Sequence, residues 1–263
     1  MVLNETGTII YFTALTPEGM AGIFSVPAAG GTATAIMSGG VLQFPFGLAL
    51  SCDNATLIVV DLGSPDEETT MSAGALYSVP VSGGSPTRLT LTGVDLPTGI
   101  AYNADCSALY VAGHTADGRG AVFTVAPTGG AATAVVQGPP LMAPSDIHVD
   151  MNNVAYVVDH MAVGGAGRGV LFRITGGVAT EAASGLALGT PGGVATTARG
   201  GSVIIPTRTA AGAGQLTIIN AGNSMATQLA APDLVDPAGI GVARMSGTFA
   251  VVDSEGGAIF RAQ

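Results

Sequence analysis

The chain has 263 residues, of which 48% are hydrophobic and only 10% are charged, and its formal net charge is −10 with no lysine. This composition provides apolar side chains for a large core, so we expect a single domain over residues 1–263 and no long disordered segment. The acidic balance argues against a nucleic-acid partner. No apolar run reaches about eighteen residues, which argues against a membrane span, and the first residues do not have the pattern of a signal peptide.

A proline-led segment recurs through the chain at intervals of roughly 47 residues, which is the period of a propeller blade. Each copy reads Pro-x-Gly or Pro-x-Asp before a short apolar run, and the copies begin at Pro45, Pro97, Pro144, Pro191 and Pro237. A second apolar run follows each copy, and these runs end at Asp61, Gly113, Asp159, Thr207 and Asp253. A third run follows a glycine, and a weaker fourth run closes the unit.

Four short apolar runs per unit predict an all-β fold, a six-bladed β-propeller whose blades are four-stranded antiparallel sheets. The first unit begins near Thr8 without a proline-led segment, and the last stops after its third run. Either a first strand is missing or the ring closes in a way that the pattern does not reveal, so we expect an atypical terminal blade. An unpaired strand edge there predicts a homo-oligomer that forms through the incomplete blade.

The proline-led segments, together with second strands that end in Val-Val-Asp, resemble the six-bladed propellers of the NHL-repeat and gluconolactonase-like group over nearly the whole chain. The resemblance implies the fold. Gluconolactonase-like enzymes hold calcium through oxygen ligands that include an Asn or Asp directly after the proline. The corresponding residues here are Phe46, Thr98, Ser145, Gly192 and Ala238, so the calcium site of that group does not carry over.

In such a propeller the first strands begin and the second strands end on one face, which we call the proline face. Blade four departs from the repeat near this face. Asp146 and His148 occupy positions at which the other blades have glycine or alanine. An ionisable group among such small residues is costly unless it is paired or ligated.

The other two histidines, His114 and His160, directly follow the second strands of blades three and four, and Arg208 continues this position in blade five. We therefore expect His114, His148 and His160 to hold a divalent metal, with zinc favoured over calcium, which would activate a water molecule. Asp146 or Asp159 would be a further ligand or would orient one, and Arg208 would hold a substrate oxygen. Alternatively, His148 bonds a backbone carbonyl, the other histidines are solvated, and Arg208 is an exposed loop residue. In that case Asp159 caps a turn like its equivalents Asp61 and Asp253.

The first reading predicts a metal-dependent hydrolase of lactones, aryl esters or phosphotriesters, with a small-molecule substrate. The alternative is a non-catalytic propeller that binds a protein or a glycan. The acidic loop from Asp66 to Glu68 is either a lid or a solvated surface loop. The glycine-rich stretch from Gly164 to Gly169 has no helix after it and is not a nucleotide site.

Cys52 and Cys106 are the only cysteines, and they lie in the turns between the first and second strands of neighbouring blades. These turns share the face opposite the proline face, so we expect a structural disulfide between them. A disulfide implies an oxidising compartment, which predicts a periplasmic or extracellular protein.

Overall fold

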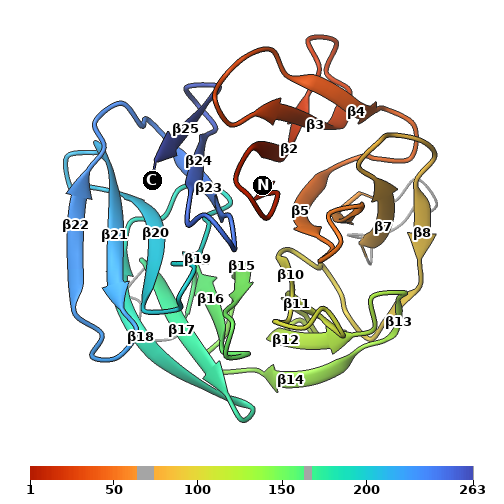
Figure 1. The fold of residues 1–263 in the computed structure, drawn as a ribbon. Coiled ribbons are helices and arrows are strands. Elements are labelled where there is room, and N and C mark those ends of the chain that lie inside the picture. The colour runs from red at the N-terminus through yellow and green to blue at the C-terminus, as the bar shows by residue number, and fades with distance from the viewer. Residues whose placement is uncertain (64–73, 163–167, 263) are drawn as a thin grey trace.

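A computed structural model of the protein describes residues 1–63, 74–162 and 168–262. Six small sheets stand around a central axis like the blades of a propeller, with residue 1 near the centre of the ring (Figure 1). The acidic loop from Asp66 to Glu68 and most of the glycine-rich stretch lie outside the described residues. The predicted six-bladed all-β fold is confirmed.

The strands follow the chain blade by blade. Blade one contains β1 (Val2–Leu3), β2 (Ile9–Leu15), β3 (Ala21–Pro27) and β4 (Thr34–Ser38). Blade two contains β5 (Pro45–Leu50), β6 (Thr56–Asp61), β7 (Ala75–Pro80) and β8 (Thr87–Leu89). Blade three contains β10 (Ile100–Tyr102), β11 (Leu109–His114), β12 (Gly120–Val125) and β14 (Thr133–Gln137). Blade four contains β15 (Pro144–Val149), β16 (Ala155–Asp159), β17 (Gly169–Thr175) and β18 (Val178–Leu186).

Blade five contains β19 (Ala195–Thr196), β20 (Ser202–Arg208), β21 (Gly214–Asn220) and β22 (Ala226–Ala230). Blade six contains β23 (Pro237–Val242), β24 (Phe249–Asp253) and β25 (Ala258–Ala262). Between blades two and three, β9 (Leu91–Thr92) pairs in parallel with β13 (Gly130–Ala131). Every other pairing is antiparallel, and the described residues include no helix and hence none that could span a membrane.

Blade one explains the irregular start of the repeat. Its first strand is β1, which pairs with β2 through Val2 and Tyr11. Because β1 has only two residues and no proline before it, the sequence pattern did not reveal it. Blade six has three strands within the described residues, which confirms the atypical terminal blade. Association of two copies along β25 stays a prediction.

The ring closes where side chains of blade one meet those of blade six. Leu3 and Ile10 are buried in one cluster with Ala243 and Ala250. No strand of one end of the chain is inserted into the sheet of the other end in the described residues. The amide of Met245 in blade six also donates a hydrogen bond of 3.0 Å to the carbonyl oxygen of Glu5 in blade one. Apolar contact and this hydrogen bond join the first and last blades.

The core lies between adjacent blades, and β6 shows why its strands are apolar at consecutive positions. Leu57 and Val59 are buried against blade one, whereas Ile58 and Val60 are buried against blade three. Successive side chains of a strand point to opposite faces, and here both faces are covered. Each such side chain contributes about 1.5–3 kcal/mol through burial.

The innermost strands approach one another closely around the axis. A Cβ atom on Gly99 would lie 2.7 Å from the Cα of Asp146, and one on Gly193 would lie 2.6 Å from the backbone nitrogen of Ile240. Glycine is required because a side chain at either position would collide with the backbone of the next blade. This packing makes the side chain of Asp146, at the equivalent position of blade four, an exception.

Candidate functional site

On the proline face, the two histidines that follow second strands connect neighbouring blades. His114 Nε2 is 3.1 Å from the carbonyl oxygen of Met142, and His160 Nε2 is 2.5 Å from that of Pro191. A carbonyl oxygen only accepts, so each Nε2 carries the proton and donates. Both acceptors lie on the loop that leads into the next blade, and the role of each histidine is therefore to bond one blade to the next.

Arg208 makes the same kind of connection between blades five and six. Its guanidinium forms an ion pair of 3.0 Å with Asp236 and donates a hydrogen bond of 3.5 Å to the carbonyl oxygen of Leu188. We refer to His114, His160 and Arg208 as the interblade clasps. The predicted substrate-binding role of Arg208 finds no support in these contacts.

Asp159 is fully buried and its carboxylate is occupied by backbone donors. It accepts hydrogen bonds from the amides of Met142, Ala143 and Met161 at 2.8–3.0 Å. Asp61 and Asp253 bind the corresponding amides of their own blades. The alternative that these aspartates cap turns is confirmed, and Asp159 has no free oxygen for a metal or a substrate.

His148 lies apart from the clasps, inside the central channel. It is the fifth residue of β15, and four residues of strand correspond to about 13 Å along the axis. Within the described residues, no group of three or more His, Cys, Asp or Glu side chains is arranged to hold a metal ion. The sequence-based expectation that the three histidines converge is therefore not met, because His148 lies toward the opposite face, and the predicted zinc site finds no support.

A cavity of about 130 Å³ occupies the channel around His148. Its wall is formed mostly by apolar residues of the inner strands, such as Leu48, Ile100 and Ile240. It extends to turn residues on the face opposite the proline face, among them Cys52. We call this the disulfide face. The ionisable side chains at the cavity are Glu5, Tyr102, Asp146, His148 and Arg244.

Asp146 reaches the cavity and also connects blades four and five. Its Oδ2 accepts a hydrogen bond of 3.0 Å from the amide of Val194, and β15 has a bulge next to it, which redirects the strand. Burial raises the pKa of Asp146 to about 6, although the amino group of Met1 and the amides of Val194 and Ile147 favour the charged form. This carboxyl group therefore changes its charge just below neutral pH.

The His148 ring faces the cavity and has no hydrogen-bond partner among the described residues. Burial, and next the nearby charge of Arg244, lower its pKa to about 4, while Asp150 acts in the opposite direction. His148 is therefore neutral at pH 7, with one N–H donor and one acceptor nitrogen. The alternative that a backbone carbonyl satisfies this ring is not observed in the described residues.

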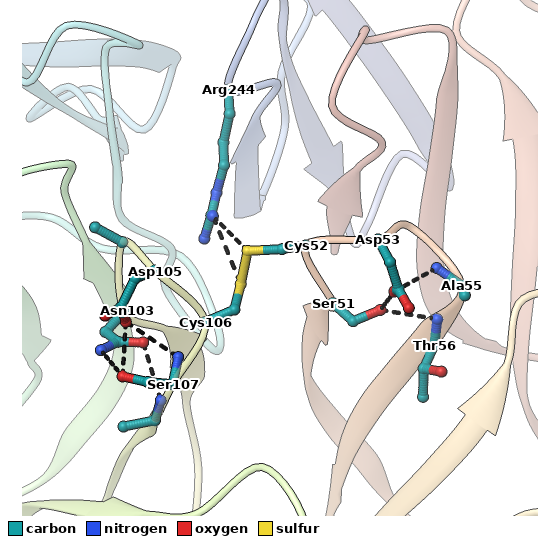
Figure 2. The surroundings of a disulfide bond; sticks show 12 residues. Ser51, Cys52, Asp53, Ala55, Thr56, Asn103, Asp105, Cys106, Ser107 and Arg244 are labelled. Carbon is teal, nitrogen blue, oxygen red and sulfur yellow. Dashed lines mark hydrogen bonds between the residues drawn. A yellow bond between two sulfur atoms is a disulfide. The ribbon is translucent and has the colours of Figure 1, made fainter.

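Arg244 is the charged cavity residue that the sequence reasoning missed. It lies in the turn after β23, and its guanidinium points at the disulfide, 3.3 Å from Cys52 Sγ and 3.9 Å from Cys106 Sγ (Figure 2). The sequence did contain a signal. The seventh residues after the five prolines are Cys52, Ala104, Met151, Ala198 and Arg244, of which only the last is charged.

The expected disulfide between Cys52 and Cys106 is present. It joins the turns of blades two and three, with a Cα–Cα distance of 6.1 Å and a separation of 54 residues in sequence. Its sulfur atoms lie at the disulfide-face end of the channel, beside the Arg244 guanidinium (Figure 2). Through Cys52, the disulfide therefore forms part of the cavity wall.

No family model matches the chain, and no curated protein matches it in sequence. A chain in the crystal structure of a nidogen/laminin complex is similar, with TM-score 0.73 and 15% identity over 96% of this chain and 88% of that one. TolB from Acinetobacter baumannii gives TM-score 0.68 and 14% identity over 88% of this chain and 53% of that one. An oligogalacturonate lyase in complex with manganese gives TM-score 0.58 and 13% identity over 99% of this chain and 75% of that one.

At these identities the similarity establishes the β-propeller fold and no activity. The named structures include a lyase, a TolB protein and a chain from a protein complex, so the fold is shared by proteins of different function. The similarity also does not distinguish the NHL-repeat and gluconolactonase-like group from other propellers.

Proposed function

We propose that the protein is a non-catalytic binding propeller that holds a small molecule in the channel cavity, near its disulfide face. One observation carries this proposal: Asp146, His148 and Arg244 line the same cavity, and most of its other lining residues are apolar. A concave apolar site with a few converging polar groups is the usual form of a small-molecule site. Two of these groups also have strongly shifted pKa values, which is typical of functional sites.

Binding is favoured over hydrolysis because the side chains needed for the predicted metal mechanism are otherwise engaged. His114 and His160 bond the next blade, and Asp159 binds backbone amides. The non-catalytic alternative from the sequence is therefore retained, with a small molecule as the ligand in place of a protein or a glycan. The disulfide also supports the proposal of a periplasmic or extracellular location.

A cavity-filling variant tests the proposal. Ala101 lines the cavity at the blade-three position equivalent to His148. In Ala101→Phe the ring should occupy the space of the ligand. We expect small fragments that bind the wild type, detected by ligand-observed NMR, to lose binding by more than about tenfold, which corresponds to about 1.4 kcal/mol.

The matched control is Ala210→Phe, which adds the same ring to an exposed loop between β20 and β21. Its fragment binding should equal that of the wild type. Circular dichroism and melting temperature establish that both variants are folded. If no fragment of a diverse library binds the wild type, or if folded Ala101→Phe keeps all binders, the channel is not a ligand site.

A further inference from the structure

The Arg244 guanidinium forms no ion pair with a carboxylate among the described residues. Burial lowers the pKa of Arg244, and the nearby charge of Glu5 acts in the opposite direction. The described residues contain two ion pairs of arginine, Arg119 with Asp117 and Arg208 with Asp236, and neither involves Arg244. Its two hydrogen-bond acceptors are disulfide sulfur atoms, which accept weakly. A partly buried positive charge without a strong acceptor is unfavourable, and a bound anion would compensate it.

His148 lies close enough to Arg244 for the charge of Arg244 to lower its pKa, and both residues line the cavity. The neutral ring presents one N–H that no protein group among the described residues accepts. Two donors of different residues thus face the same space. These two donors suit a ligand group with two acceptor oxygen atoms. Either each donor binds one oxygen, or the guanidinium binds both.

The remaining wall limits which anion fits. Leu48, Ile147 and Val149 give it an apolar surface, while Glu5 and Asp146 bring negative charge to the same cavity. Met1 also lines the cavity, and its amino group acts on Asp146, so the Arg244 guanidinium and this amino group together face two carboxyl groups. This balance does not favour a phosphate or another dianion. A single negative charge attached to a short hydrocarbon body matches both the charge and the apolar wall.

We infer that the cavity takes a small monocarboxylate, whose carboxylate binds the Arg244 guanidinium and the His148 ring while its hydrocarbon part lies against the inner strands. This inference rests on the proposed binding function and specifies its ligand. The planar guanidinium accounts for the choice of carboxylate, since its fork geometry matches two oxygen atoms in one plane.

The experiment compares butyrate, its neutral counterpart butyramide and inorganic phosphate by titration calorimetry of the oxidised protein. We expect butyrate to bind about tenfold or more tightly than butyramide, because a charge-assisted hydrogen bond replaces a neutral one. Phosphate should bind more weakly than butyrate. Arg244→Gln should reduce the preference for butyrate over butyramide to less than about twofold.

The control variant is Arg119→Gln, which removes an exposed arginine that does not line the cavity and should leave the preference unchanged. Equal affinity for butyrate and butyramide, with both lost in Ala101→Phe, would overturn the carboxylate inference while channel binding stands. Phosphate binding as tightly as butyrate would overturn it as well. If neither butyrate nor butyramide binds, the carboxylate inference fails, and the fragment library then decides separately whether the channel binds any ligand.

Discussion

Asp146 and His148 lie two residues apart on β15, and burial affects the two in opposite ways. Burial disfavours the charged form of each, so it raises the pKa of the carboxyl group to about 6 and lowers that of the imidazole to about 4. The Met1 amino group, Glu5, Asp150 and Arg244 are the other charged groups near the pair, and Tyr102 also lines the cavity. The free energy of unfolding therefore depends on pH through two terms of opposite sign.

The sign of each term follows from proton binding. Between pH 6 and about 4, folded Asp146 binds a proton that the unfolded side chain has released, so its contribution to stability is present at low pH and is lost as pH rises through 6. Between pH 6.5 and 4, unfolded His148 binds a proton that the folded ring does not, so its contribution is present above pH 6.5 and is lost as pH falls through 4. Each term amounts to about 2 kcal/mol between pH 6.5 and pH 4, and in the wild type they largely cancel.

Single substitutions should reveal each term. Asp146→Asn leaves the histidine term, so its unfolding free energy should fall by about 2 kcal/mol more than that of the wild type between pH 6.5 and pH 4. His148→Ala leaves the aspartate term, so the unfolding free energy of this variant should rise by a similar amount, relative to the wild type, between pH 6.5 and pH 4. Urea denaturation at several pH values measures both. Parallel pH profiles for the two variants would contradict the assignment of these pKa shifts.

At the scale of the element, the turns between first and second strands bond neighbouring blades at one shared position. Asn54 and Asn153 both have positive φ angles, of 57° and 60°. Their side-chain oxygen atoms accept hydrogen bonds from the backbone nitrogens of Glu5 and Ala104 in the preceding blade, at 3.0 and 2.9 Å. Cys106 occupies the same position with φ of 57°, and its disulfide to blade two replaces that hydrogen bond.

This equivalence predicts that asparagine can partly substitute for the disulfide. In a protein with Cys52→Ala, the further change Cys106→Asn should give an unfolding free energy about 1–2 kcal/mol higher than Cys106→Ala. Asparagine tolerates positive φ and can accept a bond from the backbone nitrogen of residue 52. Chemical denaturation of the two double variants measures the difference.

Glycine at position 106 separates the effect of positive φ from the effect of the side-chain hydrogen bond. It also tolerates positive φ, but it has no side-chain acceptor. Cys106→Asn should therefore be more stable than Cys106→Gly in the same Cys52→Ala background. If the two are equally stable, asparagine makes no interblade hydrogen bond there.

At the scale of the whole molecule, contacts on both faces hold the ring together. The interblade clasps act on the proline face between blades three, four, five and six, and the disulfide acts on the opposite face between blades two and three. Blades six and one are joined by a small apolar cluster and by the backbone hydrogen bond from Met245 to Glu5. A local loss of contact therefore weakens the ring as a unit.

Reduction of the disulfide should lower the unfolding free energy by about 4 kcal/mol, the chain-entropy value for a closed loop of this length. Cys52 is exposed, so a dithiol reductant can reach it. Guanidinium denaturation with and without reductant measures the change, and thiol titration shows that reduction is complete. An unchanged midpoint with both thiols free would show that the disulfide does not stabilise the fold.

The sequence by itself determined the propeller and the number of blades. It also predicted the disulfide and gave turn capping as one of two roles for the aspartates that end second strands. The propeller and its blade number follow from patterns that recur from blade to blade, such as apolar runs, glycine pairs and prolines at intervals of roughly 47 residues. Such patterns act between residues close in sequence, or between equivalent positions of neighbouring blades. For that reason the repeat could be aligned without coordinates, and the alignment placed both cysteines on one face.

Only the tertiary structure decided which polar side chains meet. His148 and His160 belong to the same blade, but His148 lies farther along β15, in the channel toward the disulfide face. The His160 ring instead donates a hydrogen bond to the carbonyl oxygen of Pro191 in the next blade. Arg244 reaches the disulfide of blades two and three because ring closure brings the turn of blade six near them. The depth of a residue along the axis and its contacts across the ring depend on residues far apart in the chain. Patterns among neighbouring residues therefore could not predict this site.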